Sequence, residues 1–441
     1  MKNWLRAFLL VGLVAAVLAA CSGTGNGGGD EASGEGGEDG GEPSGEITIW
    51  GWNVAAQSME LAVEGFQEQY PDVDVTVEDI GRLDVYEKLT VGLASGGNGL
   101  PDVVLVESDR LANYQEQFPD AITNLSEMGY DEHADKFGEY KKSVTQDENG
   151  DFFAAPWDIG PTGVFYRTDI FEEAGVNPED IQTWDDYIEA GKTIQEATGT
   201  KMVPIDIAAD DALYRMMLNQ QGAFYFDEEG NIDVASEESQ NAFETIQRLH
   251  EEDLVLNNDG WNGVVSATVN GEVATVPFGV WYSGTILDQA PDASGNWGVF
   301  KLPAFEEGGN RAANLGGSDL VIPSSSDNQT AAYAFVEYFT TEVEPQMTAL
   351  QERGIFPSLN TTYEEEYFTQ ESEYFANQQV WQTFAEQVEN IPVANYTSDY
   401  ARAFDTMSDT QATILLDDAE IPSALEDAAS KLESETGRTA N

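Results

Sequence analysis

Carboxylates are the most abundant chemically active side chains of this chain, with 81 Asp and Glu residues against 19 Lys and Arg and two His. With so many carboxylates, two will lie close enough to imitate a glycosidase pair in any fold, so such a pair carries no information. His133 and His250 do not occur in a metal-binding spacing such as HExxH. The sequence has no G-x-S-x-G motif and no phosphate-binding loop, and Asp147–Gly150 is typical of a hairpin turn rather than a calcium loop. The residues therefore predict neither a metal site nor a cofactor.

The only cysteine of the chain, Cys21, follows Lys2, Arg6 and an apolar run over 7–20 that ends in two alanines. This order is typical of a secretory signal peptide, and the run is too short for a permanent membrane helix. A cysteine directly after small residues resembles a bacterial lipobox, in which the cysteine becomes the lipid-bearing first residue of the mature chain. The alternative is an ordinary signal peptide with an incidental cysteine. We expect residues 1–20 to be a lipoprotein signal peptide and Cys21 to anchor the protein on the extracytoplasmic face of the cell membrane.

Residues 21–45 hold almost nothing apolar, which predicts a disordered, acidic, Gly-rich tether. Loss of Lys2 and Arg6 with the signal peptide would leave 17 basic residues against 81 acidic ones, a net charge of −64. The acidic residues are interleaved with apolar ones, so the charge belongs to the folded body. It argues against nucleic acid or anionic lipid as a partner. We interpret the charge as adaptation to a salty exterior; the alternative is a generally acidic secreted protein.

Apolar periodicity predicts strands that alternate with helices in the folded body. The first strands are expected at 46–50, 73–79 and 102–106, with helices at 55–70 and 85–95 between them. The last third, from about residue 330, is expected to be nearly all helical. Further strands are predicted at 164–167, 202–207, 273–278, 297–302 and 319–323. This alternation predicts an α/β fold with helices on both faces of its sheets.

Six strings occur in a characteristic order over residues 46–432. They are ITIWGWN with FQEQYPDVDV, LPDVVLVESDRLANY, FFAAPWDIGPTGVFYRTDIFEEAGV, TWDDYIEAGKTI, VPFGVWYSGTI and NLGGSDLVIPSSSDNQTAAYAFVEYFT. Together with the lipobox they resemble the extracellular solute-binding lipoproteins of sugar ABC transporters, which are related to the maltose-binding protein.

The resemblance implies a two-lobe, periplasmic-binding-protein-like fold (type II), in which each lobe is a mixed sheet flanked by helices. The chain should cross between the lobes after Pro156, near 315–319 and near Pro392. The ligand is expected in the cleft between the lobes, at the carboxyl ends of strands. The expected divisions are lobe one at 46–158 and 319–390, lobe two at 159–318 and 391–432, and a tail at 433–441.

A sugar presents C–H faces that stack on aromatic rings and hydroxyls that bond to Asp, Asn and Arg. The resemblance places candidate ligand-binding residues directly after strands or at the crossings: Trp52, Asn53, Asp109, Arg110, Trp157, Asp158, Trp281, Gly317, Asp319, Tyr396 and Tyr400. Trp50 and Trp184 are expected in the core, and the role of Trp261 is left open. Arg110 could instead pair with a surface carboxylate, and Gly317 could serve the hinge without touching ligand.

The resemblance implies the substrate-binding subunit of a carbohydrate ABC importer, which captures a mono- or oligosaccharide and delivers it to the membrane permease. The expected partners are the sugar, the permease subunits and the membrane through the lipid on Cys21, and the protein is expected to be a monomer without enzymatic activity. Scarcity of basic residues favours a neutral sugar over an anionic one. The alternatives are a secreted carbohydrate-active enzyme, a surface adhesin and a receptor for a polar osmolyte.

Replacement of the lipidation candidate tests the anchor. Cys21→Ser removes the thiol that would carry the lipid, so the variant should leave the membrane fraction and appear in the medium or the detergent-free fraction. Fractionation followed by immunoblotting measures this. A variant that stays with membranes to the same extent as the parent protein would contradict the lipobox interpretation.

Overall fold

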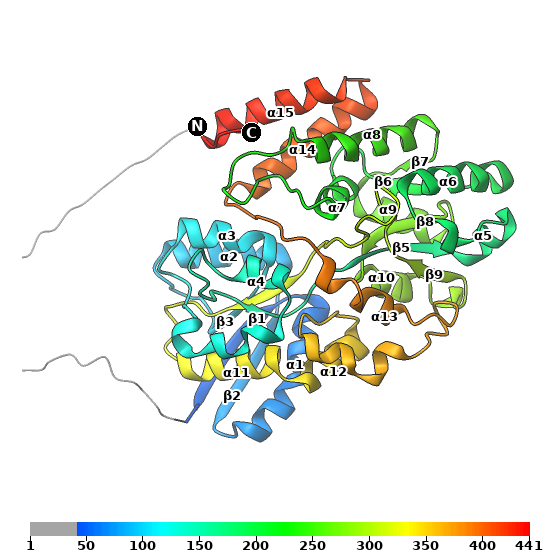
Figure 1. The fold of residues 1–441 in the computed structure, drawn as a ribbon. Helices are drawn as coiled ribbons and strands as arrows, with labels where there is room; N and C mark the ends of the chain where they lie inside the picture. Colours follow the sequence, from blue (N-terminus) through cyan, green and yellow to red (C-terminus); the bar gives the residue numbers. More distant parts are fainter. Residues whose placement is uncertain (1–41) are drawn as a thin grey trace, which may run out of the picture. The chain divides into compact units, whose positions relative to one another are not determined.

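Three β-sheets organise residues 42–441, the part of the chain that this computed structural model describes (Figure 1). Contacts join residues 43–441 into one unit. The predicted signal peptide, Cys21 and the predicted tether up to residue 41 lie outside the described residues. Within residues 42–441, no helix combines the length and the apolar character needed to cross a membrane.

The first sheet is mixed, with the strand order β2-β1-β3-β10-β4. Its first three strands run parallel, and β10, from much later in the chain, lies antiparallel between β3 and β4. The strands are β1 (Gly45–Gly51), β2 (Val73–Asp79), β3 (Val103–Glu107), β4 (Ala155–Pro156) and β10 (Ser318–Val321). The strands predicted at 46–50, 73–79 and 102–106 are confirmed to within one residue at each end.

Helices far apart in the sequence pack together on this sheet, since α1 contacts both α11 and α12. On the buried side of α1, the ring of Phe66 meets the ring of Phe335 edge to face at 5.2 Å between centroids. The helices of this part are α1 (Asn53–Gln69), α2 (Arg82–Ala94), α3 (Ser108–Gln117), α4 (Glu139–Thr145), α11 (Gln329–Thr341) and α12 (Val343–Arg353).

The second sheet is antiparallel, with the order β8-β5-β9, and a parallel pair, β6-β7, lies next to β8. Its strands are β5 (Thr162–Arg167), β6 (Val203–Ile205), β7 (Val255–Asn257), β8 (Thr275–Gly279) and β9 (Trp297–Phe300). The sequence predicts all of these except β7, whose three residues are too few to produce a clear period.

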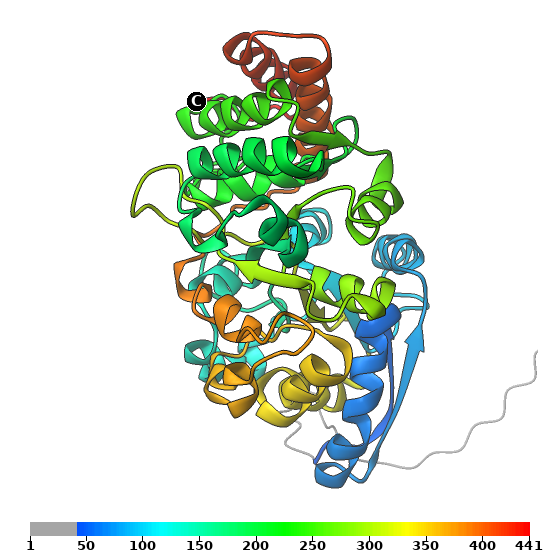
Figure 2. The ribbon, with the colours of Figure 1, turned by 90° about the vertical axis from the view of Figure 1, so that its right-hand side faces the viewer.

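Helices surround the second sheet, and Figure 2 shows α8, α14 and α15 packed side by side at the end away from α1. The helix α6 begins with a capping box, in which the side chains of Thr183 and Asp186 bond reciprocally to the backbone. The helices are α5 (Thr168–Ala174), α6 (Trp184–Thr198), α7 (Ala212–Gln220), α8 (Glu237–Glu251), α9 (Gly260–Val269), α10 (Tyr282–Gln289), α13 (Val380–Ala385), α14 (Tyr400–Leu416) and α15 (Ile421–Thr436).

Buried apolar side chains form two clusters, one on each main sheet. We call the parts of the chain that carry most of each cluster lobe one (45–158 and 318–355) and lobe two (159–317 and 356–441). Four buried residues of lobe one, Tyr140, Val144, Met347 and Leu350, join the cluster of lobe two. This division corrects the expected boundary at 390, because the buried apolar side chains from Phe356 to Val388, except Leu359, belong to the cluster of lobe two and α13 contacts β9. The third crossing therefore lies near 354–359 rather than near Pro392.

The last residues of the chain, expected as a tail after 432, extend the second lobe. α15 continues to Thr436, and Ala440 pairs with Ile232 as a parallel bridge. The backbone N–H of Ile232 donates to the carbonyl of Thr439 at 2.8 Å, and that of Asn441 donates to the carbonyl of Ile232 at 3.0 Å. These bonds hold the end of the chain on lobe two.

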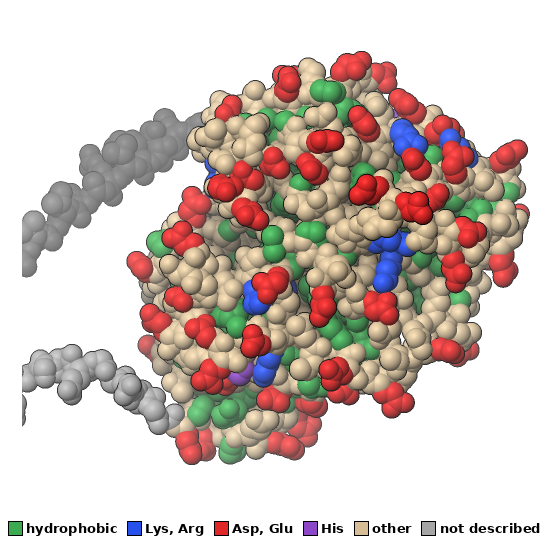
Figure 3. Space-filling view, in the orientation of Figure 1, with side chains coloured by type: hydrophobic (Ala, Val, Ile, Leu, Met, Phe, Trp, Pro, Cys, Tyr) green, Lys and Arg blue, Asp and Glu red, His purple; other side chains and the backbone are tan. Residues whose placement is uncertain are grey.

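Acidic side chains cover the face seen in Figure 3, over both lobes, whereas Lys and Arg are few. The distribution agrees with the interleaving of acidic and apolar residues in the sequence. Each sheet can bury its apolar faces while its helices present carboxylates to water.

The structure corrects the expected position of Trp157. Its side chain is 1% exposed and packs against Phe339 at 5.3 Å between ring centroids, within the cluster of lobe one. The residue follows β4, which pairs with β10, and its carbonyl accepts a hydrogen bond from the backbone N–H of Ser358 at 2.9 Å. These backbone bonds fix the segment so that the indole lies in the core.

Truncation of Trp157 should therefore destabilise the fold. Trp157→Ala should lower the free energy of unfolding by ~3–5 kcal/mol, because a large buried ring leaves a cavity. Trp261→Ala is the control: that side chain is 43% exposed and its loss should cost much less. Urea unfolding measures both, and equal losses would contradict these placements.

Candidate ligand-binding cleft

Two adjoining hollows of about 620 and 560 Å³ lie where side chains of lobe one face those of lobe two. Six residues line both hollows, which therefore form one cleft: Arg82, Asp109, Asp210, Arg215, Trp261 and Tyr400. Its size is typical of a pocket that holds a small molecule.

Lobe one contributes residues that follow the carboxyl ends of its parallel strands. Asn53 comes after β1 and takes a φ of 49°, a left-handed conformation that asparagine tolerates better than most residues. Its backbone N–H donates to Asp79 Oδ1 at 2.8 Å, which holds this turn to the end of β2. Asp109 and Arg110 follow β3 in the first turn of α3. Parallel strands bring these turns to one edge of the sheet, as expected for this fold.

Glu107 organises the cationic side of this wall. Its carboxylate accepts two hydrogen bonds from Arg82, at 2.9 and 2.7 Å, and a third from the hydroxyl of Tyr86 at 2.7 Å. Arg110 lies 3.8 Å from the same carboxylate, and its guanidinium lies 4.2 Å from the centroid of the Tyr86 ring. The bidentate pair fixes Arg82 and neutralises most of its charge.

Asp109 differs from Glu107 because its Oδ1 is buried and accepts no hydrogen bond from the described residues. Burial, and then the negative charge of Glu107, raises the pKa of Asp109 to about 6, although the nearby arginines oppose the shift. Asp109 as a residue lines both hollows, so its carboxyl group can take part in hydrogen bonds with the hydroxyls of a ligand.

Lobe two contributes an aromatic wall. Trp261, at the start of α9, is 43% exposed, and its ring lies 5.7 Å from Trp281 and 5.8 Å from Phe278. The Trp281 indole N–H donates to the carbonyl of Leu315 at 2.8 Å, which ties this wall to the second crossing. The exposed ring of Trp261 thus rests on fixed aromatic neighbours.

A second group on lobe two surrounds Arg215. Its guanidinium donates to Asp211 at 2.7 Å, to Asp210 at 3.2 Å and to the hydroxyl of Tyr400 at 2.8 Å. The ring of Tyr400 meets that of Tyr396 edge to face at 5.0 Å. Burial raises the pKa of Asp211 to about 6 even though Arg215 favours its charged form. Arg215 therefore positions Tyr400 while its own charge is balanced.

The structure brings most of the expected site residues together at the cleft. These are Asn53, Asp109, Arg110, Trp281, Gly317, Tyr396 and Tyr400. Gly317 has a φ of 110°, and a Cβ there would lie 3.1 Å from the carbonyl oxygen of Asp158, so the crossing itself requires glycine. Gly317 therefore meets the hinge requirement as well as lining the cleft.

Four expected site residues lie elsewhere. Trp52 is 9% exposed and packs edge to face against Tyr86 at 5.7 Å, so it supports the cleft wall from behind. Trp157 lies in the core. Asp158 and Asp319 lie at the first and second crossings and line neither hollow of the cleft; Asp158 bonds to Ser318 and Asp319 to Ser108.

Sequence reasoning does not assign Arg82, Arg215 or Trp261 to the site. Trp261 comes four residues after β7, so the rule that places site residues after strands would have found it if β7 had been recognised. Arg82 opens α2 and Arg215 lies in the first turns of α7, and the sequence shows no signal that separates them from other surface arginines.

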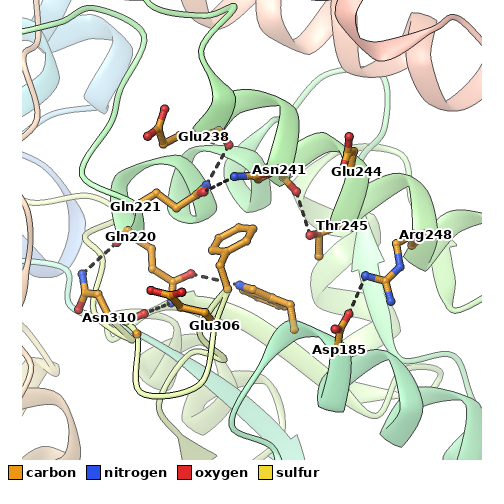
Figure 4. A pocket seen from close by; sticks show the side chains of 13 residues that line it. Asp185, Gln220, Gln221, Glu238, Asn241, Glu244, Thr245, Arg248, Glu306 and Asn310 are labelled. Atoms are coloured by element: carbon orange, nitrogen blue, oxygen red, sulfur yellow. Dashed lines mark hydrogen bonds and ion pairs between the residues drawn. The ribbon is translucent and has the colours of Figure 1, made fainter.

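Another pocket, of about 560 Å³, lies wholly on lobe two between the start of α6, the helices α7 and α8, and the loop around Glu306 (Figure 4). Its polar side chains bind one another: Asn241 donates to Gln221 at 3.2 Å, and Arg248 donates to Asp185 at 2.6 Å. Beneath them, the Trp184 indole, 2% exposed, donates to Gln220, which confirms the expected core position of Trp184. We assign no ligand to this pocket.

Comparison with known proteins identifies the class. Residues 51–344 match the family described as bacterial extracellular solute-binding protein. A lactose-binding protein of Rhizobium radiobacter is 35% identical over 80% of this chain and 84% of the relative. An arabinooligosaccharide-binding protein of Halalkalibacterium halodurans is 28% identical over 80% of this chain and 82% of the relative. The chain therefore belongs to the bacterial extracellular solute-binding protein family.

Solved structures support the same fold. The sugar-binding protein MalE of Xanthomonas citri superposes with a TM-score of 0.77 at 19% identity, covering 88% of this chain and 97% of that one. A binding protein of Bifidobacterium animalis subsp. lactis, in complex with β-1,6-galactobiose, gives 0.73 at 24% identity, covering 90% and 100%. The predicted two-lobe α/β binding-protein fold is confirmed.

The raised pKa of Asp109 predicts a pH dependence of stability. Between about pH 4 and pH 6 the folded protein holds a proton that the unfolded chain has lost, so the free energy of unfolding should fall as pH rises through this range. Asp109→Asn removes this contribution. The difference in free energy of unfolding between the variant and the parent protein should therefore change with pH up to about pH 6 and then stay constant. Urea unfolding at a series of pH values measures it.

Asp147→Asn provides the control. Hydrogen bonds within an exposed turn lower the pKa of Asp147, so its contribution to stability should be lost as pH falls, which is the opposite sign. A pH profile of Asp109→Asn parallel to that of the parent protein would show that Asp109 has an ordinary pKa.

Proposed function

We propose that this protein is the sugar-binding subunit of an ABC importer, which captures a neutral oligosaccharide outside the cell and delivers it to a membrane permease. The observation that carries the proposal is the exposed ring of Trp261, backed by Trp281, in the same cleft as the carboxylate of Asp109. A pyranose ring needs this combination, an aromatic face for its C–H groups and a fixed acceptor for its hydroxyls. The lactose-binding and arabinooligosaccharide-binding relatives support the same ligand class.

The charges of the cleft favour a neutral ligand. Each arginine that lines it already contacts a carboxylate: Arg82 and Arg110 contact Glu107, and Arg215 contacts Asp210 and Asp211. A phosphorylated or acidic sugar would bring another negative charge to cations that are already neutralised, beside the carboxylate of Asp109. The charge of such a ligand would not find the free cation that anion-binding sites supply.

Delivery rather than turnover is the proposed activity, since the named relatives are binding proteins. The sugar should therefore be recovered unchanged after incubation with the protein. We further propose that the mature protein is a monomer held at the outer face of the cell membrane by lipid on Cys21. A relative in Streptococcus pneumoniae named as a maltooligosaccharide solute-binding lipoprotein supports this part, and the fractionation of Cys21→Ser tests it.

Calorimetric titration of the purified protein tests the ligand class. The panel contains lactose, an arabino-oligosaccharide, β-1,6-galactobiose, an acidic disaccharide and glycine betaine as a polar osmolyte. At least one neutral sugar should bind, and Trp261→Ala should weaken its binding ~10–100-fold, because a stacked aromatic contact contributes on the order of 1–3 kcal/mol.

Trp157→Phe is the matched control, since it alters a tryptophan of the core and should leave the affinity unchanged in the folded protein. Binding of the acidic disaccharide or of the osmolyte alone would replace the proposed ligand class. Chemical turnover of the bound sugar at an enzymatic rate would favour the carbohydrate-active enzyme.

A further inference from the structure

Lys141, in α4, is a fully buried lysine. Its ammonium forms an ion pair with Asp319 and donates hydrogen bonds to Ser108 Oγ at 3.1 Å and to the carbonyl oxygen of Ser318 at 3.3 Å. A lysine is almost never buried without such partners, because the cost of removing its charge from water must be offset. None of these groups lines the cleft, so the cluster has no direct contact role with a ligand there.

The partners of Lys141 belong to the segments on which the cleft depends. Ser108 is the first residue of α3 and directly precedes Asp109. Its hydroxyl donates to Asp319 Oδ2 at 2.6 Å, and its backbone N–H donates to the carbonyl of Gly317 at 3.1 Å. The ammonium therefore connects the first turn of α3 to the second crossing between the lobes.

The first crossing joins the same cluster through Asp158. Its Oδ1 accepts a hydrogen bond from the backbone N–H of Ser318 at 2.6 Å, and its own N–H donates to the carbonyl of Ser318 at 3.2 Å. Burial raises the pKa of Asp158 to about 7; Lys141 of α4 opposes the shift and Asp319 of β10 adds to it. Asp158 therefore ties the first crossing to Ser318, whose carbonyl also binds the Lys141 ammonium.

The neighbouring side chain of α4 reaches lobe two. The hydroxyl of Tyr140 lies 3.1 Å from that of Tyr396, which lines the cleft, and accepts a hydrogen bond from Asn314 Nδ2 at 2.8 Å. Two consecutive residues of one short helix thus contact the cleft-bearing parts of both lobes.

We propose that Lys141 is a positioning residue for ligand binding, whose ammonium fixes the first turn of α3, and with it Asp109 and Arg110, to the crossings between the lobes. The proposal rests on the proposed function, because it concerns the same cleft.

The test compares Lys141→Met and Ser108→Ala with the control Lys142→Met. Lys141→Met removes the ammonium but leaves Asp319 buried without its partner, so it will also lower stability. Ser108→Ala cuts only the side-chain link to α3 and leaves the ion pair in place. Lys142 is the next residue of α4, and its ammonium pairs with the exposed Glu139.

Two measurements separate positioning from stability. Calorimetric titration should show that Lys141→Met and Ser108→Ala both weaken sugar binding about tenfold. Ser108→Ala should lower the free energy of unfolding far less than Lys141→Met does. Hydrogen–deuterium exchange of the ligand-free proteins should be faster in residues 107–114 and 316–320 for both variants. Lys142→Met should match the parent protein in each.

Unchanged exchange and unchanged affinity in Ser108→Ala and Lys141→Met would overturn the positioning role. If the parent protein binds no sugar, the proposed function fails, while exchange at 107–114 in the ligand-free protein still decides the role of Lys141.

Discussion

The pairing of β10 with β3 is the interaction on which the arrangement of the cleft depends. Ser318 pairs with Glu107 and Asp319 with Val106, so the end of the second crossing is held beside the turn that begins α3. The same strand pairs with β4 on its other side, which brings in the first crossing. Segments separated by about two hundred residues therefore meet within one strand spacing, and the charged cluster around Lys141 fills the space that they enclose.

The distribution of charge follows a simple rule inside this strongly acidic protein. The cations that are buried or line the cleft each lie beside one or more carboxylates, whereas the other cations, such as Arg248, share the surface with the surplus of negative charge. Arg215 shows the reason: with Asp210 and Asp211 on either side, it can orient Tyr400 without presenting a free positive charge. A cleft built in this way is polar and directional but not cationic.

Much of the fold was predictable from sequence because local pattern and global fold agree in lobe one. Short β-branched strands alternate with amphipathic helices, and polar residues follow the strands at Asn53 and Asp109. The prediction fails where pairing between strands that are distant in the sequence determines where a side chain lies. Trp157 follows a strand of two residues whose side-chain direction is fixed by β10, and Trp261 follows one of three residues that leaves no period. Lys141 and Lys142 are adjacent and chemically identical, so only the packing of α4 could show which one is buried.

The aromatic wall of lobe two has an optical consequence. Among the tryptophans of residues 42–441, Trp261 is 43% exposed and Trp281 is partly buried beside it, whereas Trp50, Trp52, Trp157, Trp184, Trp297 and Trp381 are buried. Indole emission shifts to the red when the ring meets water, so the long-wavelength edge of the emission from residues 42–441 comes from the cleft. A molecule that covers Trp261 and its neighbour Trp281 removes water from these rings and shifts this edge to the blue. The intrinsic tryptophan fluorescence of the protein therefore reports whether the cleft is occupied, with no added label.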